Sequence, residues 1–87
     1  MTGSIYILKS QKTHKYYIGS TKNIEKRLYE HNSGQTKSTK NGIPWQLVFS
    51  QVFDSVQLAR KIEYKLKKLK NRKILEKIIT EGIVKLR

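Results

Sequence analysis

The segment Ser4–Gly19 reads SIYILKSQKTHKYYIG and contains two short apolar runs separated by a polar stretch. The runs Ser4–Lys9 and Lys15–Gly19 are rich in β-branched and aromatic residues, which favour strands. The polar residues Ser10–His14 between them are typical of a hairpin connection. This segment therefore predicts a β-hairpin.

A helix is expected directly after the hairpin. Ser20–Asn23 is a cluster of residues that favour the N-cap position, and Ile24–His31 follows at helical spacing. Gly34 suits a left-handed conformation and ends this helix. The basic, hydroxyl-rich residues 35–44 (QTKSTKNGIP) then predict a loop that is closed by its proline.

The second half of the chain predicts one more strand and a long amphipathic helix. Leu47–Phe53 (LVFSQVF) predicts the third strand, and its apolar composition favours a central place in the sheet. Either Asp54 or Ser55 caps the helix that follows, with Gln57 placed as in a capping box. The apolar stripe of this helix is spaced by three and four residues and consists of Val56, Ala59, Ile62, Leu66 and Leu69.

A third helix completes the expected order of elements. It runs from about Asn71 to Thr80 and ends at Gly82, and its inward residues are Ile74, Leu75, Ile78 and Ile79. The order β-β-α-β-α-α predicts a small α/β (α+β) fold, in which three helices flank a three-stranded, mainly antiparallel sheet. Because 87 residues are too few for two hydrophobic cores, residues 1–87 are expected to form a single domain.

The composition narrows the classes of function. The chain has 19 Lys and Arg residues against 6 Asp and Glu residues, a formal net charge of +13. This charge suits a polyanionic partner, and nucleic acid is the first expectation, ahead of an anionic membrane or an acidic protein. The absence of cysteine excludes disulfides, a thiolate nucleophile and a Cys-ligated zinc site. Because the sequence shows neither a signal peptide nor a membrane-spanning run, the predicted location is the cytoplasm.

Four side chains of the hairpin and the first helix point to chemistry. Arg27 and His31 are four positions apart and share one helix face with apolar residues. Tyr6 and Tyr17 are eleven positions apart across the hairpin, and strand alternation places Tyr6 on the face of Leu8. Taken singly, each has an ordinary interpretation. The guanidinium of Arg27 would reach solvent, His31 would be hydrogen-bonded at the edge of the apolar face, and the tyrosines would be half-buried packing residues. Two tyrosines that face a helix carrying an arginine and a histidine are, however, a less ordinary combination.

Glu63 stands out by its surroundings. It is the only acidic residue in Arg60–Lys73, which holds eight basic residues. An ordinary helical ion pair with Lys67, four residues later, is one interpretation. The other is a carboxylate ligand for one hard cation such as Mg²⁺, which keeps most of its waters and binds few protein oxygens. The residues alone leave both open.

In this order, the residues resemble the GIY-YIG nuclease domain, particularly its small stand-alone bacterial members related to the nuclease module of the excinuclease. The first motif is Ser4-Ile5-Tyr6, with Ser in the place of the usual Gly, and the second is Tyr17-Ile18-Gly19. Arg27-x-x-x-His31 is the helical signature, and Glu63 falls at the position of the family's metal ligand. The resemblance covers residues 4 to about 70, and the stretches typical of the stand-alone branch are Thr36–Lys40 and Pro44–Val48.

The resemblance implies a role for each of these side chains. Tyr6 would act as the general base toward water or as the nucleophile. Tyr17 and His31 would orient Tyr6 and move its proton. Arg27 would bind the scissile phosphate. Glu63 would hold a single Mg²⁺, for which Mn²⁺ is the expected substitute.

Substrate contacts are expected from basic residues around this centre. The candidates for contacts to the nucleic-acid backbone are Lys22, Lys37, Lys40, Lys61, Lys65 and Lys68. The asparagine that many family members carry on the last helix falls near Leu75 here, and Asn71 is the nearest asparagine. This departure concerns the choice of substrate more than the activity.

The predicted function is a Mg²⁺-dependent DNA endonuclease, a hydrolase of phosphodiester bonds with a role in DNA repair. DNA structure or a partner protein is expected to direct it, since the chain offers no separate sequence-reading domain. RNA is the alternative substrate. Two other classes stay open: a nucleic-acid-binding module without catalysis, and a small basic RNA-associated structural protein. The oligomeric state, a monomer included, is open as well.

Overall fold

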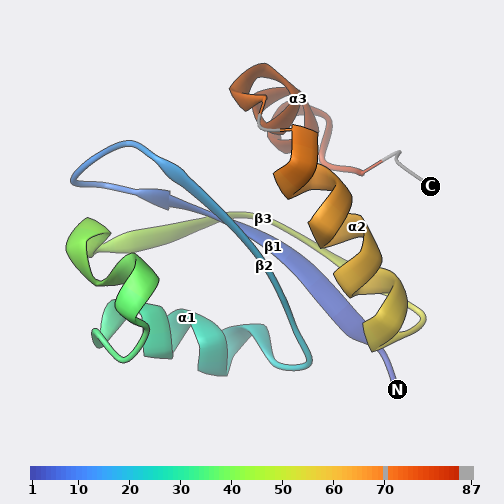
Figure 1. Ribbon diagram of the computed structural model, residues 1–87, viewed down its shortest axis with the longest axis horizontal. Helices are drawn as coiled ribbons and strands as arrows, with labels where there is room; N and C mark the ends of the chain where they lie inside the picture. Colours follow the sequence, from blue (N-terminus) through green and yellow to red (C-terminus); the bar gives the residue numbers. More distant parts are fainter. Residues whose placement is uncertain (70, 85–87) are drawn as a thin grey trace.

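The computed structural model describes residues 1–69 and 71–84 and contains one antiparallel sheet with helices on it (Figure 1). The strands are β1 (Gly3–Ser10), β2 (Tyr16–Thr21) and β3 (Trp45–Phe53). The helices are α1 (Ile24–Asn32), α2 (Val56–Leu69) and α3 (Arg72–Glu81), with a short 3₁₀ helix η1 (Lys37–Gly42) before β3. The predicted α+β fold and the order β-β-α-β-α-α are confirmed. In the part of the chain that is described, no helix has the length and apolar character needed to cross a membrane.

The central strand is β1, so the prediction that Leu47–Phe53 is central is wrong. The order in the sheet is β2-β1-β3, and every residue of β1 except Lys9 is buried. A central strand needs apolar side chains on both faces, and β1 supplies them along its length. On β3, which begins two residues earlier than predicted, polar side chains such as Gln46 and Ser50 are exposed. This alternation is typical of a strand with one solvated face.

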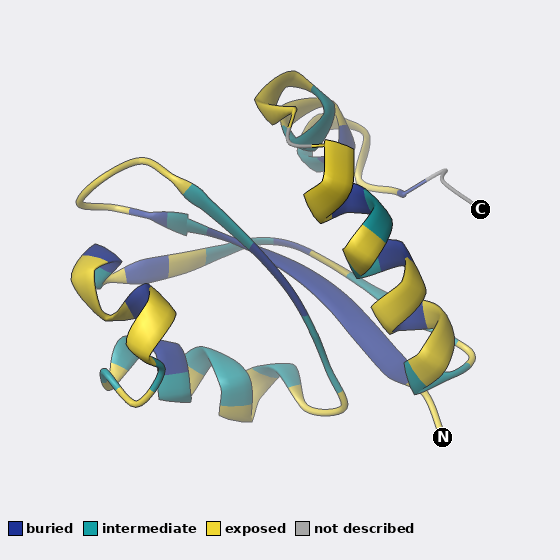
Figure 2. Cartoon of the chain, in the orientation of Figure 1, coloured by how far each residue is buried: buried dark blue, intermediate teal, exposed yellow. Residues whose placement is uncertain are grey.

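Helices cover both faces of the sheet (Figures 1 and 2). Helices α2 and α3 pack on the face that carries Ile5 and Ile7. Helix α1 lies on the other face, where Tyr6 and Leu8 point. The strand alternation in the sequence predicts this division correctly. As a result, His31 of α1 is directed towards Tyr6 in the middle of the sheet.

Side-chain caps fix where the helices begin. Asn23 Oδ1 accepts a hydrogen bond from the Lys26 amide at 3.1 Å at the start of α1. Ser55, not Asp54, caps α2, because its Oγ accepts from the Leu58 amide at 3.0 Å. Asn71 caps α3 through its side-chain oxygen. The helix positions therefore follow from local sequence signals.

The predicted loop over residues 35–44 contains the 3₁₀ helix η1, which the sequence analysis did not predict. Its first turn is closed by the Thr39 amide, which donates to the Thr36 carbonyl at 3.1 Å. The indole Nε1 of Trp45 donates to the Thr39 carbonyl at 2.8 Å and anchors η1 to the start of β3. The short helix thus depends on a tertiary contact that no local pattern encodes. Its consequence is that Thr39 is buried beside α1.

Candidate active site

A buried series of hydrogen bonds links β1, α1 and η1. The Tyr6 hydroxyl lies 2.9 Å from Nε2 of His31, and Nδ1 of the same ring lies 2.8 Å from Oγ1 of Thr39. The Thr39 hydroxyl donates to the carbonyl of Thr36 at 3.3 Å. Tyr6, His31 and Thr39 are 2%, 0% and 1% exposed. Water therefore does not compete for these bonds.

The direction of these bonds sets the protonation of His31. The Thr39 hydroxyl has one hydrogen, which it gives to Thr36, so it accepts the Nδ1–H of His31. Nε2 is then an unprotonated acceptor for the Tyr6 O–H. Burial, and secondly the charge of Arg27, lowers the pKa of His31 and favours this neutral form. His31 is placed to take a proton from Tyr6.

Tyr6 holds its own proton firmly in this environment. Burial raises the pKa of Tyr6, and the nearby guanidinium of Arg27 opposes the rise. A phenol of this kind stays protonated at neutral pH unless a base removes the proton. The hydrogen-bonded Nε2 of His31 is such a base.

Tyr17 completes an aromatic cluster around this pair. Its ring centroid lies 4.9 Å from that of His31 and 6.4 Å from that of Tyr6. The ring also packs edge-on against Trp45 at 6.3 Å. Tyr17 is half-buried, so one side of its ring borders the site and the other reaches the surface. The structure brings together both tyrosines and the histidine that the sequence analysis selected.

Gly19 is required by the position of the Tyr6 ring. The two residues are direct partners across β1 and β2. A Cβ atom at position 19 would overlap the hydroxyl of Tyr6. The glycine of the second motif therefore makes room for the phenol, which is a packing reason for its identity.

Arg27 lies at the edge of the site and is held by a neighbour on its own helix. Its Nη1 lies 2.8 Å from Oε1 of Glu30, and this ion pair raises the pKa of Arg27 further. Arg27 also borders an open cavity of about 430 Å³ between β2, α1 and the start of α2. Lys22, Lys26 and Arg60 line the same cavity. The cavity is therefore strongly cationic and suits an anionic group.

Glu63 makes two polar contacts, one of them the ion pair that the sequence suggested. Lys67 Nζ lies 2.7 Å from Oε2, and the Ser20 hydroxyl donates to Oε1 at 2.5 Å. Among the described residues, no group of three or more His, Cys, Asp or Glu side chains could hold a metal ion. A cation here would therefore be bound by one carboxylate. This donor set fits Mg²⁺, which retains several waters and takes one or two carboxylates together with substrate phosphates.

The lysines predicted to contact nucleic acid come from three parts of the structure. Lys22 lies between β2 and α1 and lines the cavity beside Arg27. The other five belong to η1 (Lys37 and Lys40) and to α2 (Lys61, Lys65 and Lys68). All are exposed except Lys65, which is half-buried. Of these six lysines, only Lys22 is among the described residues that line the cavity beside Arg27.

Sequence analysis missed five polar residues of the site, among them Lys26, which lines the cavity beside Arg27. Arg60 is three residues before Glu63, so helical spacing would have found it. Glu30 is likewise three residues after Arg27. Ser20 and Thr39 reach their partners only through the tertiary fold, and no local signal identifies them.

The fold and this site define a GIY-YIG catalytic domain. The family model with that description matches residues 2–77, which include both tyrosines, Arg27, His31 and Glu63. The chain therefore belongs to the GIY-YIG family of nucleases. The two motifs that give the family its name lie side by side on β1 and β2.

Within this family, the chain is similar to small bacterial proteins of the UPF0213 group. The UPF0213 protein SSP2268 of Staphylococcus saprophyticus is 46% identical over 79 residues, which cover 90% of this chain and 94% of that protein. The UPF0213 protein CPE1444 of Clostridium perfringens is 38% identical, over 91% of this chain and 85% of the relative. The solution NMR structure of the UPF0213 protein BH0048 from Bacillus halodurans superimposes with a TM-score of 0.59 at 31% identity, over 94% of this chain and 87% of that one.

Proposed function

We propose that the protein is a metal-dependent endonuclease that hydrolyses DNA phosphodiester bonds. The observation that carries this proposal is the buried hydrogen bond between the Tyr6 hydroxyl and Nε2 of His31. If these residues only filled space, apolar side chains would do so without burying two polar groups that need hydrogen-bond partners. A phenol joined to a base, near an arginine that borders a cationic cavity, is instead suited to proton transfer at a bound phosphate.

The proposed proton path runs through the hydrogen bonds of the site. Tyr6 accepts a proton from the attacking water as its own phenolic proton passes to Nε2 of His31. The imidazolium that forms stays hydrogen-bonded to Thr39 through Nδ1. Tyr17 packs against both rings and holds them in register. Tyr6 thus serves as the general base toward water. Because burial raises the pKa of Tyr6, it can do so only while His31 takes its phenolic proton.

Arg27 is proposed to bind the scissile phosphate. Its guanidinium has several donors in a fixed plane, which suits two oxygens of one phosphate. Glu30 now holds one of its nitrogens and so presets its direction. Lys22, Lys26 and Arg60 share the cavity and would add attraction for the backbone on either side.

Glu63 is proposed to hold Mg²⁺, with Mn²⁺ as a substitute. When bound, the ion would neutralise charge on the phosphoryl oxygens and stabilise the leaving oxygen. The hydroxyl of Ser20 orients one oxygen of the carboxylate. Lys67 is paired with the other oxygen and must release it to the ion.

The expected setting of this activity follows from the same features. The net charge of +13 favours binding to DNA backbone without reading sequence, so DNA structure or a partner protein would select the substrate. RNA is the alternative substrate. We place the activity in the cytoplasm and in DNA repair.

A nuclease assay tests the proposal directly. Purified protein is incubated with supercoiled plasmid, branched DNA and RNA, with Mg²⁺ or with EDTA. The matched variants are Tyr17→Phe, Arg27→Ala and Glu63→Gln. We expect Mg²⁺-dependent cleavage of DNA by the parent protein and its loss in Arg27→Ala and Glu63→Gln. Cleavage that survives Glu63→Gln would contradict the assignment of the metal ligand.

A binding module without catalysis is the second candidate. The ion pairs Arg27–Glu30 and Glu63–Lys67 favour it, since each occupies a group that catalysis needs. Both pairs are partly exposed and therefore weak, so a phosphate or a cation can displace them. Binding without Mg²⁺-dependent cleavage of any of the three substrates would establish this second function and refute the first.

A further inference from the structure

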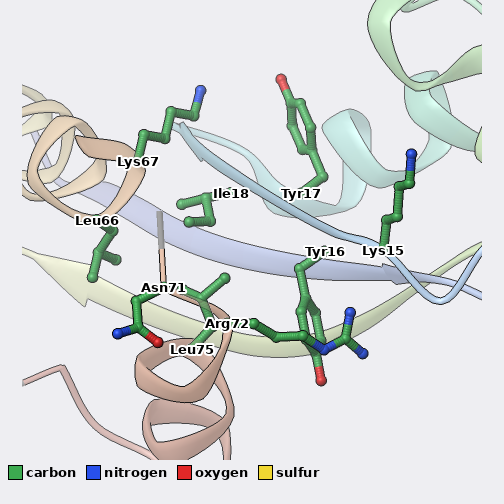
Figure 3. Close-up of a pocket in the computed structure, with 9 residues that line it drawn as sticks. All are labelled: Lys15, Tyr16, Tyr17, Ile18, Leu66, Lys67, Asn71, Arg72 and Leu75. Atoms are coloured by element: carbon green, nitrogen blue, oxygen red, sulfur yellow. The ribbon is translucent and has the colours of Figure 1, made fainter. Parts of the chain in front are cut away.

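A second groove lies at the free edge of the sheet, on the far side of Tyr17 from His31. It is an open cavity of about 420 Å³ between β2, the end of α2 and the start of α3. Figure 3 shows Lys15, Tyr17 and Lys67 on one side of β2 and Tyr16 and Arg72 on the other. Neither the proposed catalytic residues other than Tyr17 nor the predicted backbone contacts belong to it.

The lining of this edge groove combines an apolar floor with a cationic rim. Ile18 and Leu66 are buried at its base, and Leu75 is half-buried beside them. The rim carries the positive groups of Lys15, Lys67 and Arg72. No acidic side chain is among the described residues that line the groove. Such a lining suits a ligand that is flat and apolar at one end and anionic at the other.

Tyr16 and Arg72 form a prepared stacking surface in this groove. The guanidinium of Arg72 lies over the Tyr16 ring, 4.6 Å from its centroid. Its Nη1 also donates to the carbonyl of His14 at 3.0 Å, and its Nε lies 3.3 Å from Glu76. These two contacts hold the arginine over the ring. Aromatic rings and guanidinium planes are the surfaces on which unpaired bases stack.

Tyr17 separates the groove from the proposed catalytic centre by the thickness of one ring. It lines the groove and also packs against His31 at 4.9 Å between ring centroids. Lys67 likewise lies over the Tyr17 ring at 5.4 Å and contacts Glu63. A strand whose phosphate is bound at the proposed catalytic centre would therefore have the groove beside it, across the Tyr17 ring.

We propose that the edge groove binds one unpaired nucleotide next to the cleaved phosphate. Its base stacks on the outer plane of the Arg72 guanidinium, which the Tyr16 ring supports, and against the apolar floor. Its phosphate lies between Lys15 and Lys67. A paired base cannot enter, because its outer face is covered by the neighbouring base pair. The groove thus makes the protein prefer single-stranded segments or flaps to continuous duplex. This inference rests on the proposed nuclease function of the neighbouring site.

The test measures binding without cleavage. Fluorescence anisotropy in EDTA compares a labelled single-stranded oligonucleotide with a blunt duplex of the same length, using the parent protein and Tyr16→Ala. Loss of one stacked base is expected to weaken single-strand binding about 5- to 100-fold. The affinity for the duplex is expected to change less than about twofold, since it depends on backbone charge.

Tyr64→Ala is the matched control. Tyr64 is a tyrosine on α2 that is 66% exposed and has Lys68 5.8 Å above its ring, but it lines no part of the groove. This control is expected to leave both affinities unchanged. An equal loss on both DNAs, or the same loss in Tyr64→Ala, would overturn the proposal.

If Tyr16→Ala does not fold, Tyr16→Trp tests the stacking proposal instead. The new indole is expected to lose fluorescence when the single strand is added, because a base stacks on the guanidinium that covers it. The parent protein gives the background of Trp45, which is 8% exposed. Unchanged fluorescence at saturating DNA would overturn the proposal.

The two proposals fail in different ways. Selective single-strand binding without cleavage of any substrate would refute the nuclease and leave the groove standing. Loss of cleavage in Glu63→Gln together with normal binding by Tyr16→Ala would refute the groove and leave the nuclease standing.

Discussion

Replacing Thr39 with valine tests whether the hydrogen bonds around His31 set its protonation. Thr39→Val keeps the shape of a side chain that is 1% exposed but removes the hydroxyl 2.8 Å from Nδ1. The Nδ1–H is then buried without an acceptor, which costs about 1–3 kcal/mol of folding free energy. The free energy of unfolding, measured with urea, should fall by that amount. For a chain of this size, each kcal/mol corresponds to about 4–8 °C in Tm.

The same change should reduce catalysis more than it reduces stability. His31 can avoid the buried donor by moving its proton to Nε2, but it then no longer accepts the proton of Tyr6. Positioned proton transfer contributes about 10²–10⁴-fold to rates, so cleavage should fall within that range at temperatures where the variant is folded. The assay is the initial rate of plasmid cleavage with Mg²⁺.

Thr39→Ser is the control, because it keeps the hydroxyl and loses only a methyl group. It should retain a cleavage rate close to that of the parent protein. If Thr39→Val is folded and cleaves as fast as Thr39→Ser, the bond to His31 does not set the tautomer, and the proposed proton path is wrong.

Three further changes address other parts of the site. Gly19→Ala should lower the free energy of unfolding in urea by about 1–3 kcal/mol and abolish cleavage, because its Cβ displaces the hydroxyl of Tyr6. A stable and active variant would show that the phenol can move without loss of activity. Burial lowers the pKa of His31, so below about pH 6.5 the unfolded chain binds a proton that the folded chain does not. The free energy of unfolding should therefore fall as the pH drops from 7 to 5, and His31→Gln should show a smaller fall. Lys67→Gln should lower the Mg²⁺ concentration for half-maximal cleavage by up to about fivefold, since it frees an oxygen of Glu63. An unchanged Mg²⁺ titration would mean that the ion pair does not compete with Mg²⁺ for Glu63.

Local signals predicted most of the fold. The capping residues Asn23 and Asn71 begin their helices, and Gly82 ends α3 in a left-handed conformation, as expected. Strand alternation assigned the two faces of β1 correctly, which placed Tyr6 opposite α1. These features depend on neighbouring residues, so the sequence contains them in readable form.

Predictions failed where the outcome depends on distant residues. The apolar run Leu47–Phe53 suggested a central strand, but strand order depends on which strand pairs with both others. The 3₁₀ helix η1 is held by Trp45, whose contact with Thr39 joins two different elements. The sequence shows the composition of these segments, but it does not show which other elements they contact.

The sequence by itself determined the order of the elements, the basic character of the chain and the side chains that can do chemistry. Tyr6, Tyr17, His31 and Glu63 are selected as candidates because their order and spacing resemble the motifs of the GIY-YIG domain. Only the tertiary structure brings the Thr39 hydroxyl within 2.8 Å of Nδ1 of His31, since the two buried residues belong to different elements. Likewise, only folding places Arg72 on Tyr16, because stacking joins residues far apart in the chain.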